Sequence, residues 1–275
     1  MIHNTIEITV SGSQFHGYLI TYFHEQTPEI SKKIRPTVLI CPGGAYSSTS
    51  DREGEPLAMQ FLAMGYHAAV LRYSTEPARF PEALLQLARA VEILRENAEI
   101  WGIDTKRIIL QGSSAGGHLA ASLGVFWNQP FLSERLGVPP EQYRPNGLML
   151  CYPVITSGEK GHQGSFVNLL GPEYLDMEKR SMVSLEMQIT KQTPPTFLWH
   201  TATDEAVPVE NSIVFFRALH AAGVPAEMHI YPVGPHGLVL STEETAGPQG
   251  QWIQNECKSW IYLAQDWMKY TFETH

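Results

Sequence analysis

A serine flanked by glycines is the residue best placed to do chemistry in this sequence. Ser114 is the centre of Gly112-Ser113-Ser114-Ala115-Gly116, a G-x-S-x-G pattern that follows the apolar run Ile108–Leu110 and precedes a predicted helix. A nucleophilic serine needs such a sharp strand-to-helix turn, and the glycines remove side chains that would clash there. The bare pattern arises by chance in about one chain in ten of this size. Its position makes Ser114, rather than Ser113, the predicted nucleophile.

A glycine-containing turn lies upstream of this serine. The run Cys41-Pro42-Gly43-Gly44-Ala45-Tyr46 follows the predicted strand Thr37–Cys41. The tetrahedral intermediate of acyl transfer carries a negative oxygen, which needs N–H donors already in place, and adjacent glycines let the backbone turn its N–H groups inward. We predict an oxyanion hole formed by the backbone N–H groups of Gly44, Ala45 and Ala115. Taken alone, an ordinary Pro-Gly-Gly turn is the commoner explanation.

An acid and a histidine follow the serine in the order of a known type of triad. Asp204 comes after the predicted strand Thr196–Thr201, and His236 comes after the predicted strand Glu227–Tyr231. The order Ser, Asp, His is one of those in which serine triads occur. His236 would accept the proton of Ser114 and return it to the leaving alcohol, while Asp204 would hold the imidazole tautomer and stabilise its protonated form.

Neighbouring residues offer alternatives to this triad. Glu205 is the alternative acid, because it adjoins the predicted one. His118 is the alternative base, but the direction of its predicted helix carries it away from the Ser114 hydroxyl. His200 lies inside a predicted strand and receives no catalytic role. His236 is preferred because it lies in a loop with glycine and proline, just past a late strand.

The elements that must position these residues alternate between strand and helix. Strands are predicted at Ile6–Val10, Tyr18–Phe23, Thr37–Cys41, His67–Tyr73, Arg107–Gln111, Gly147–Ile155, Thr196–Thr201 and Glu227–Tyr231, and helices at Glu53–Met64, Pro81–Leu94, Ala115–Trp127, Val209–Ala222 and Trp252–Tyr270. This alternation predicts an α/β fold with a mostly parallel sheet, whose chemistry lies beyond the carboxyl ends of the strands. The first two strands are expected to pair as an antiparallel edge.

One segment interrupts that alternation. Residues 156–195 separate two strands by more than a simple crossover needs, and they contain a loop with Gly158, Gly161 and Gly164 and a predicted helix near Met177–Met187. An insertion after the carboxyl end of a strand is well placed to cover a pocket as a lid. A crossover helix with a long surface loop explains it equally well. The alternating strands and helices predict a single domain over residues 1–275, with residues 156–195 as a possible insertion.

Composition limits the partners. The sequence has 19 Lys and Arg against 28 Asp and Glu, a formal charge of −9, which argues against nucleic acid and anionic membranes as partners. No apolar run is long enough to span a bilayer, and the first residues do not resemble a signal peptide, so a cytoplasmic protein is expected. Three scattered cysteines suggest no zinc site, and no nucleotide or metalloprotease motif occurs, so no metal or cofactor is expected. A homodimer is the general expectation for such enzymes.

Together, four segments resemble the α/β-hydrolase lipase and esterase family. They are Pro42–Tyr46, Gly112–His118, His200–Pro208 and Pro235–Gly237. Within that family the chain is most similar to bacterial carboxylesterases and acetyl-xylan-esterase-like enzymes related to hormone-sensitive lipase. One departure is visible, because the related group has His-Gly-Gly-Gly where this chain has Pro42-Gly43-Gly44-Ala45. Backbone N–H groups suffice there, so the alanine can still donate.

The resemblance implies a serine carboxylesterase acting on short acyl esters, in particular acetyl esters, with acetylated sugars or xylo-oligosaccharides as candidate substrates. Tyr46 and Tyr152 are predicted pocket residues, with packing as the alternative role for each. Two other functions stay open. A prolyl-oligopeptidase-like peptidase would need an added gating domain, for which this length leaves no room. A non-catalytic binding protein of this fold would be expected to lack a triad residue, and none is lacking.

Overall fold

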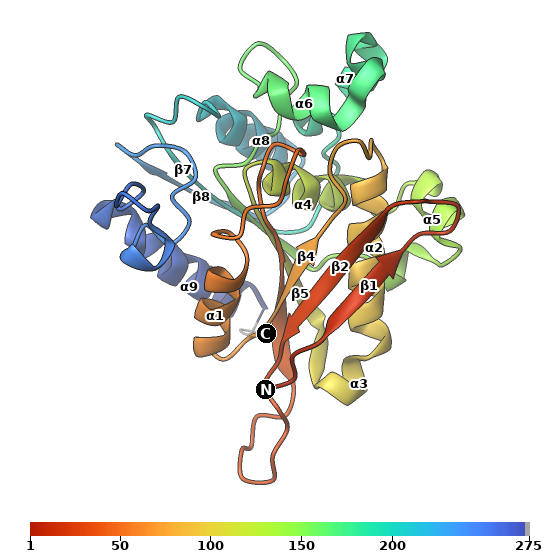
Figure 1. Ribbon diagram of the computed structural model, residues 1–275, viewed down its shortest axis with the longest axis vertical. Coiled ribbons are helices and arrows are strands. Elements are labelled where there is room, and N and C mark those ends of the chain that lie inside the picture. Colours follow the sequence, from red (N-terminus) through yellow and green to blue (C-terminus); the bar gives the residue numbers. More distant parts are fainter. Residues whose placement is uncertain (273–275) are drawn as a thin grey trace.

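The computed structural model describes residues 1–272, which hold an eight-stranded sheet (Figure 1). The strand order is β1-β2-β4-β3-β5-β6-β7-β8. The first two strands form an antiparallel edge, as predicted, and β2 also pairs antiparallel with β4, whereas all later pairs are parallel. The strands are β1 (Thr5–Thr9), β2 (His16–Tyr22), β3 (Arg35–Cys41), β4 (His67–Arg72), β5 (Ile103–Ser113), β6 (Gly147–Cys151), β7 (Thr196–Thr201) and β8 (Ala226–Tyr231).

Helices cover both faces of the sheet (Figure 1). Two of them, α1 (Glu55–Ala63) and α9 (Trp260–Phe272), pack on one face. The other face carries α2 (Glu82–Glu96), α4 (Ala115–Phe126) and α8 (Glu210–Ala221), with the short helices α3 (Ala98–Trp101) and α5 (Pro130–Leu136) beside them. Because both faces are covered, the parallel strands are apolar on both sides.

Strand β3 illustrates how one apolar run serves two cores. Val38 and Ile40 join the cluster beneath α1 and α9, while Leu39 and Cys41 join the cluster beneath α2 and α4. Successive side chains of a strand point to opposite faces, so the run must be apolar throughout. Contacts on both faces hold the strand in place, and the turn that follows Cys41 lies at the carboxyl edge of the sheet.

Two of the predicted elements differ clearly from the observed ones, for reasons visible in the backbone. Strand β6 stops at Cys151, because Tyr152 has a φ of 38° and the chain then turns so that the N–H of Val154 donates to the carbonyl of Ser114 at 3.0 Å. The C-terminal helix begins at Trp260 rather than Trp252, whose φ of 70° is incompatible with a right-handed helix.

Residues 156–195, here called the cap, lie above the carboxyl ends of the strands, over α4 (Figure 1). They contain α6 (Gln163–Leu170), which was not predicted, and α7 (Met177–Met182), which ends earlier than the predicted helix. Phe166, Leu169 and Leu185 are buried in the same cluster as α2 and α4. The cap is thus packed into the core in this structure, and its mobility stays a prediction.

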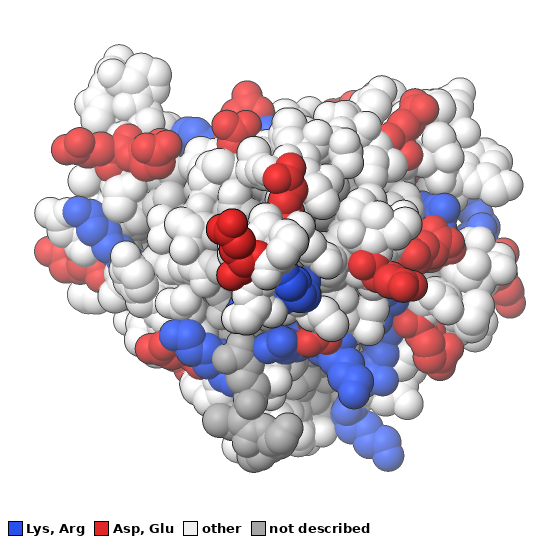
Figure 2. All heavy atoms as spheres, turned by 90° about the horizontal axis from the view of Figure 1, so that it is seen from below, with Lys and Arg blue, Asp and Glu red and all other residues white. Residues whose placement is uncertain are grey.

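The end of the molecule away from the cap carries both signs of charge. In Figure 2, Lys and Arg side chains gather in the lower part of the visible face, and Asp and Glu side chains border them. None of the helices within residues 1–272 is both long enough and apolar enough to cross a membrane. The three cysteines are buried and unpaired.

Candidate active site

The turn between β5 and α4 holds Ser114 in a strained conformation. Its φ is 55° and its ψ is −122°, a region that side-chain-bearing residues rarely adopt. The N–H of Ser114 donates to the carbonyl of Cys151 at 3.0 Å, which fixes the turn. A Cβ on Gly112 would overlap the carbonyl of Gly116, and one on Gly116 would overlap the carbonyl of Cys41. The two glycines are therefore needed where strand and helix approach.

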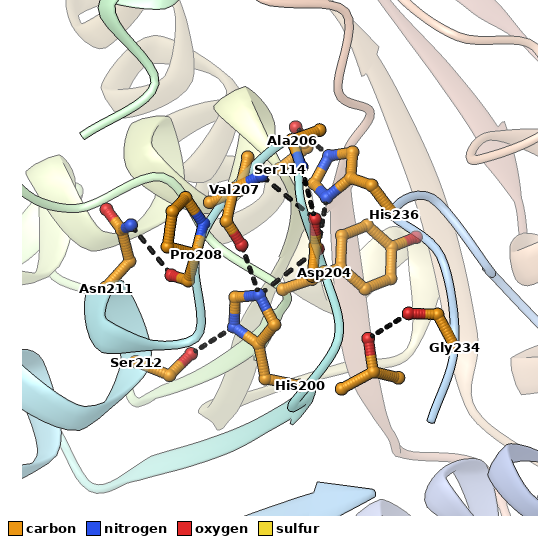
Figure 3. Close-up of polar contacts among 12 residues, drawn as sticks. Ser114, His200, Asp204, Ala206, Val207, Pro208, Asn211, Ser212, Gly234 and His236 are labelled. Atoms are coloured by element: carbon orange, nitrogen blue, oxygen red, sulfur yellow. Dashed lines mark hydrogen bonds and ion pairs between the residues drawn. The ribbon is translucent and has the colours of Figure 1, made fainter. Parts of the chain in front are cut away.

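The structure brings the three predicted triad residues together (Figure 3). The Nε2 atom of His236 lies 2.8 Å from the Oγ atom of Ser114, and its Nδ1 atom lies 2.6 Å from Oδ2 of Asp204. Because a carboxylate can only accept, Nδ1 carries the hydrogen and Nε2 is left to accept from the serine hydroxyl. This is the geometry of a serine activated by a general base.

Asp204 is buried and surrounded by donors. Its Oδ1 accepts the N–H groups of Ala206 at 3.0 Å and Val207 at 2.9 Å, and its Oδ2 lies 3.2 Å from Nε2 of His200. Burial by itself would raise the pKa of Asp204, but the hydrogen bonds from His200 and His236 outweigh it and hold the pKa well below its usual range. The carboxylate therefore stays ionised beside the imidazole. The alternative acid, Glu205, is not the partner of His236.

His200 supports this carboxylate from behind, a role that the sequence analysis missed. Its Nε2 also lies 2.9 Å from the carbonyl of Val207, so Nε2 must be the donor, and Nδ1 accepts from the hydroxyl of Ser212 at 2.8 Å (Figure 3). The side chain is fully buried. His200 is thus a positioning residue for Asp204. The sequence offered one signal for this contact, which is that His200 precedes Asp204 by four residues.

The turn after β3 lies beside the serine. Gly44 has a φ of 132° and Ala45 a φ of 55°, and both residues line the cavity that contains Ser114. Within residues 1–272, no hydrogen bond occupies the N–H of either residue. The N–H of Ala115 belongs to the first residue of α4 and has no partner within the helix. These N–H groups are free to serve as the predicted oxyanion hole.

Two side chains that were not predicted hold this turn in place. Glu53 is buried, and its carboxylate accepts the N–H of Gly43 at 2.7 Å and the hydroxyl of Tyr152 at 2.8 Å. From the cap, the Nδ2 of Asn168 donates to the carbonyl of Ala45 at 2.9 Å. Glu53 precedes α1, which begins at Glu55 and not at the predicted Glu53.

The predicted pocket tyrosines pack instead of lining the cavity. Tyr46 is buried, and its hydroxyl bonds to Nδ1 of His118 at 2.9 Å. Tyr152 is buried with its ring edge-on to the ring of His236, 5.1 Å between centroids. Both residues have a positive φ themselves, 58° for Tyr46 and 38° for Tyr152. Neither tyrosine lines the cavity that contains Ser114, and their burial agrees with packing, the alternative role predicted for each.

His118 is excluded as the general base by its own partners. Its Nε2 donates to the carbonyl of Val183 in the cap at 2.8 Å, and its Nδ1 faces the hydroxyl of Tyr46. Burial lowers the pKa of His118 to about 4, so the ring is neutral at neutral pH. It joins the cap to α4, and its ring nitrogens are bonded away from the serine.

A cavity of about 240 Å³ contains the reacting groups. It is lined by Gly44, Ala45, Ser50, Glu53, Ser114, His162, Ala206, Val207 and His236. A neighbouring hollow of about 570 Å³ shares Ala206 and His236 with it. Among residues 1–272, no group of three or more His, Cys, Asp or Glu side chains is arranged to hold a metal ion.

The sequence of this chain is similar to those of known proteins. Residues 26–219 match the BD-FAE family. The chain belongs to the BD-FAE family. Curated relatives include endo-1,4-beta-xylanase B of Butyrivibrio fibrisolvens, 37% identical over 82% of this chain and 35% of that protein, and an acetylxylan esterase of Xylanibacter ruminicola, 28% identical over 78% of this chain and 44% of that protein. The chain spans less than half the length of either relative.

Solved structures resemble this BD-FAE protein over nearly all of its length. An acetyl ester-xyloside bifunctional hydrolase from Caldicellulosiruptor lactoaceticus is 33% identical, with a TM-score of 0.84 over 98% of this chain and 96% of that chain. The carboxylesterase Cest-2923 from Lactobacillus plantarum is 28% identical, with a TM-score of 0.86 over 98% of both chains. The predicted α/β-hydrolase fold and the predicted resemblance to this esterase group are confirmed.

Proposed function

We propose that this BD-FAE protein is a serine carboxylesterase that hydrolyses short acyl esters, chiefly acetyl esters of sugars or xylo-oligosaccharides. The observation that carries the proposal is the continuous relay from Ser114 through His236 to Asp204, with distances of 2.8 Å and 2.6 Å. Esterases among the relatives support ester hydrolysis, and the acetylxylan esterase and the acetyl ester-xyloside bifunctional hydrolase support the substrate class.

The acylation step follows from the relay. The Oγ of Ser114 attacks the acyl carbonyl as its proton passes to Nε2 of His236, and Asp204 stabilises the imidazolium that forms. The N–H groups of Gly44, Ala45 and Ala115 stabilise the negative oxygen of the tetrahedral intermediate. Each such donor is typically worth on the order of 10²–10³ in rate. Collapse breaks the ester C–O bond, and the imidazolium returns the proton to the alcohol that leaves.

Deacylation repeats these steps with water. His236 removes a proton from a water molecule, which attacks the acyl-Ser114 carbonyl, and the second intermediate collapses to the free acid and the serine hydroxyl. Proton transfer and electrostatic stabilisation come from side chains and backbone alone, so the proposed reaction requires neither metal nor cofactor.

The size of the site fits a short acyl group on a larger alcohol. The cavity at Ser114 is small, about 240 Å³, whereas the neighbouring hollow, about 570 Å³, begins at His236, where the leaving alcohol must take up its proton. A sugar or short oligosaccharide as the alcohol has room there. A cytoplasmic location and a homodimer stay predictions.

Acetate release from acetylated xylose and xylo-oligosaccharides, measured beside p-nitrophenyl acetate and an aminoacyl anilide, tests the proposal. Hydrolysis of the acetyl esters without cleavage of the anilide is expected. Anilide cleavage would favour the peptidase alternative. Failure to hydrolyse any ester, together with no fluorophosphonate labelling of Ser114, would favour the non-catalytic alternative.

A further inference from the structure

We infer that His162, a residue of the cap, determines specificity by donating a hydrogen bond from its Nε2 to a hydroxyl or ether oxygen of the sugar that carries the ester. The inference rests on the proposed function and deepens it, because it assigns the selection of the alcohol to a residue outside the triad.

The tautomer of His162 follows from its partners. The side chain is the N-cap of α6, and its Nδ1 accepts the backbone N–H of Ser165 at 3.3 Å and lies 2.8 Å from the hydroxyl of the same residue. A backbone N–H can only donate, so Nδ1 carries no hydrogen. The hydrogen of the neutral ring must therefore be on Nε2.

The ring is neutral and lines the cavity that contains the reacting groups. Burial lowers the pKa of His162, and the nearby His236 lowers it further. His162 lines the same cavity as Ser114 and His236. In the part of the chain that the structure describes, its Nε2–H has no protein partner. A substrate oxygen within the cavity is the partner that this donor can take.

Groups of both kinds needed for a hydroxyl line the cavity. Glu53 supplies carboxylate oxygens, which accept, and His162 supplies an N–H, which donates. A sugar hydroxyl or ether oxygen can accept from this N–H, whereas an alkyl or aryl alcohol would leave the N–H without a partner. Burying a polar group unpaired costs free energy, so the site discriminates against the apolar alcohol.

The donor is held on a fixed frame. Phe166 and Leu169 of α6 are buried in the core, and Asn168 of the same helix bonds to Ala45 in the oxyanion turn. The backbone carbonyl of Asn168 also accepts from the guanidinium of Arg79. The position of His162 is therefore tied to the turn that binds the acyl oxygen, and selection of the alcohol is linked to alignment of the acyl group.

The test compares His162→Asn with Ser165→Ala. Asparagine is among the best N-cap residues, so the Oδ1 of His162→Asn keeps an acceptor for the Ser165 N–H. The substitution removes the Nε2–H at the far end of the ring, and the asparagine amide N–H groups lie closer to the backbone. Ser165→Ala does the opposite, since it removes a partner of Nδ1 and keeps the Nε2–H. The measured quantity is kcat/KM for a monoacetylated methyl xyloside divided by kcat/KM for ethyl acetate.

We expect His162→Asn to lower this ratio about tenfold, the effect of one hydrogen bond, and Ser165→Ala to leave the ratio within about twofold of the unaltered protein. An unchanged ratio in His162→Asn would overturn the inference, even if both rates fell together. If the unaltered protein released acetate from neither ester, the proposed function would itself be overturned. The two failures are therefore distinguishable.

Discussion

The two walls of the active-site cavity are built on different principles. On the sheet side, Ser114, Asp204 and His236 each follow the carboxyl end of a strand, and the neighbouring strands fix where each loop starts. On the cap side, His162 and Asn168 belong to a segment without strands, which side-chain hydrogen bonds and a few buried apolar residues hold against the core.

This difference separates the chemistry from the choice of substrate. The sheet wall carries the proposed nucleophile, base and acid, whose geometry must be held to within tenths of an ångström for reaction. The cap wall carries the donor inferred to recognise the alcohol, and Asn168 links this wall to the turn after β3 through the Ala45 carbonyl. A cap held by side chains can change in sequence without moving the relay, which is how one fold serves many substrates.

The largest expected effect belongs to the sheet wall. Ser114→Ala should lower kcat for p-nitrophenyl acetate by on the order of 10⁴-fold or more, because the nucleophile is removed. The matched control is Ser113→Ala, since Ser113 is buried and its hydroxyl accepts from Gln111 at 3.0 Å. Initial rates and fluorophosphonate labelling by intact mass provide the measurement. A greater loss in Ser113→Ala than in Ser114→Ala would overturn the assignment.

Much of the sheet wall could be predicted from the sequence, because its signals are local. A strand is marked by an apolar run and its end by glycine or proline, as in the run from Ile108 to Gly116. The side chain that follows a parallel strand must emerge at one edge of the sheet. Ser114, Asp204 and His236 were therefore identifiable before any contact was known.

The remaining contacts depend on pairs far apart in sequence. Glu53 reaches Gly43 and Tyr152 only because β3 and β6 flank β5. The orientation of Tyr46 depends on three successive residues of positive φ, of which glycine is the only one that a sequence marks clearly. The cap has one eight-residue helix and several short turns, so no periodic pattern was long enough to reveal how it packs.

The contact between His118 of α4 and Val183 of the cap is expected to depend on pH. His118 has a pKa of about 4 in the folded protein against an ordinary 6.5, because burial disfavours its charged form. Between these values the unfolded chain binds a proton that the folded chain does not, so the free energy of unfolding decreases as pH falls from 6.5 towards 4. The decrease from pH 7 to pH 5 should be on the order of 1–2 kcal/mol for this residue.

Urea denaturation at pH 7 and pH 5 measures that decrease. His118→Gln should reduce it without abolishing it, because burial also lowers the pKa of His67 to about 4. The matched control is His220→Gln, on the exposed surface of α8, which should leave the pH dependence unchanged. If the free energy of unfolding depended equally on pH in His118→Gln and in the unaltered protein, His118 would not be held neutral in the folded state.

A smaller effect is expected where the cap touches the oxyanion turn. Asn168→Asp removes the donor to the Ala45 carbonyl and places a carboxylate against it, while the backbone of residue 168 stays held by Arg79. The turn acts mainly in the transition state, so kcat for p-nitrophenyl acetate should fall about tenfold with little change in KM. Asn255→Asp, an exposed site, is the charge-matched control. A rise in KM at constant kcat would contradict a role in aligning the turn.

The smallest effect is expected at the outer helix of the cap. Asp176 caps α7, and its carboxylate accepts the N–H of Glu178 at 2.8 Å and that of Lys179 at 3.3 Å. Asp176→Ala should lower the free energy of unfolding by about 1 kcal/mol or less, and Asp176→Asn should retain most of it, because asparagine caps equally well. No residue of α7 is buried, so its loosening should leave the sugar-ester to ethyl-acetate ratio unchanged. If Asp176→Ala lowered that ratio as much as His162→Asn, the cap would act as one unit, and selection of the alcohol could not be assigned to a single donor.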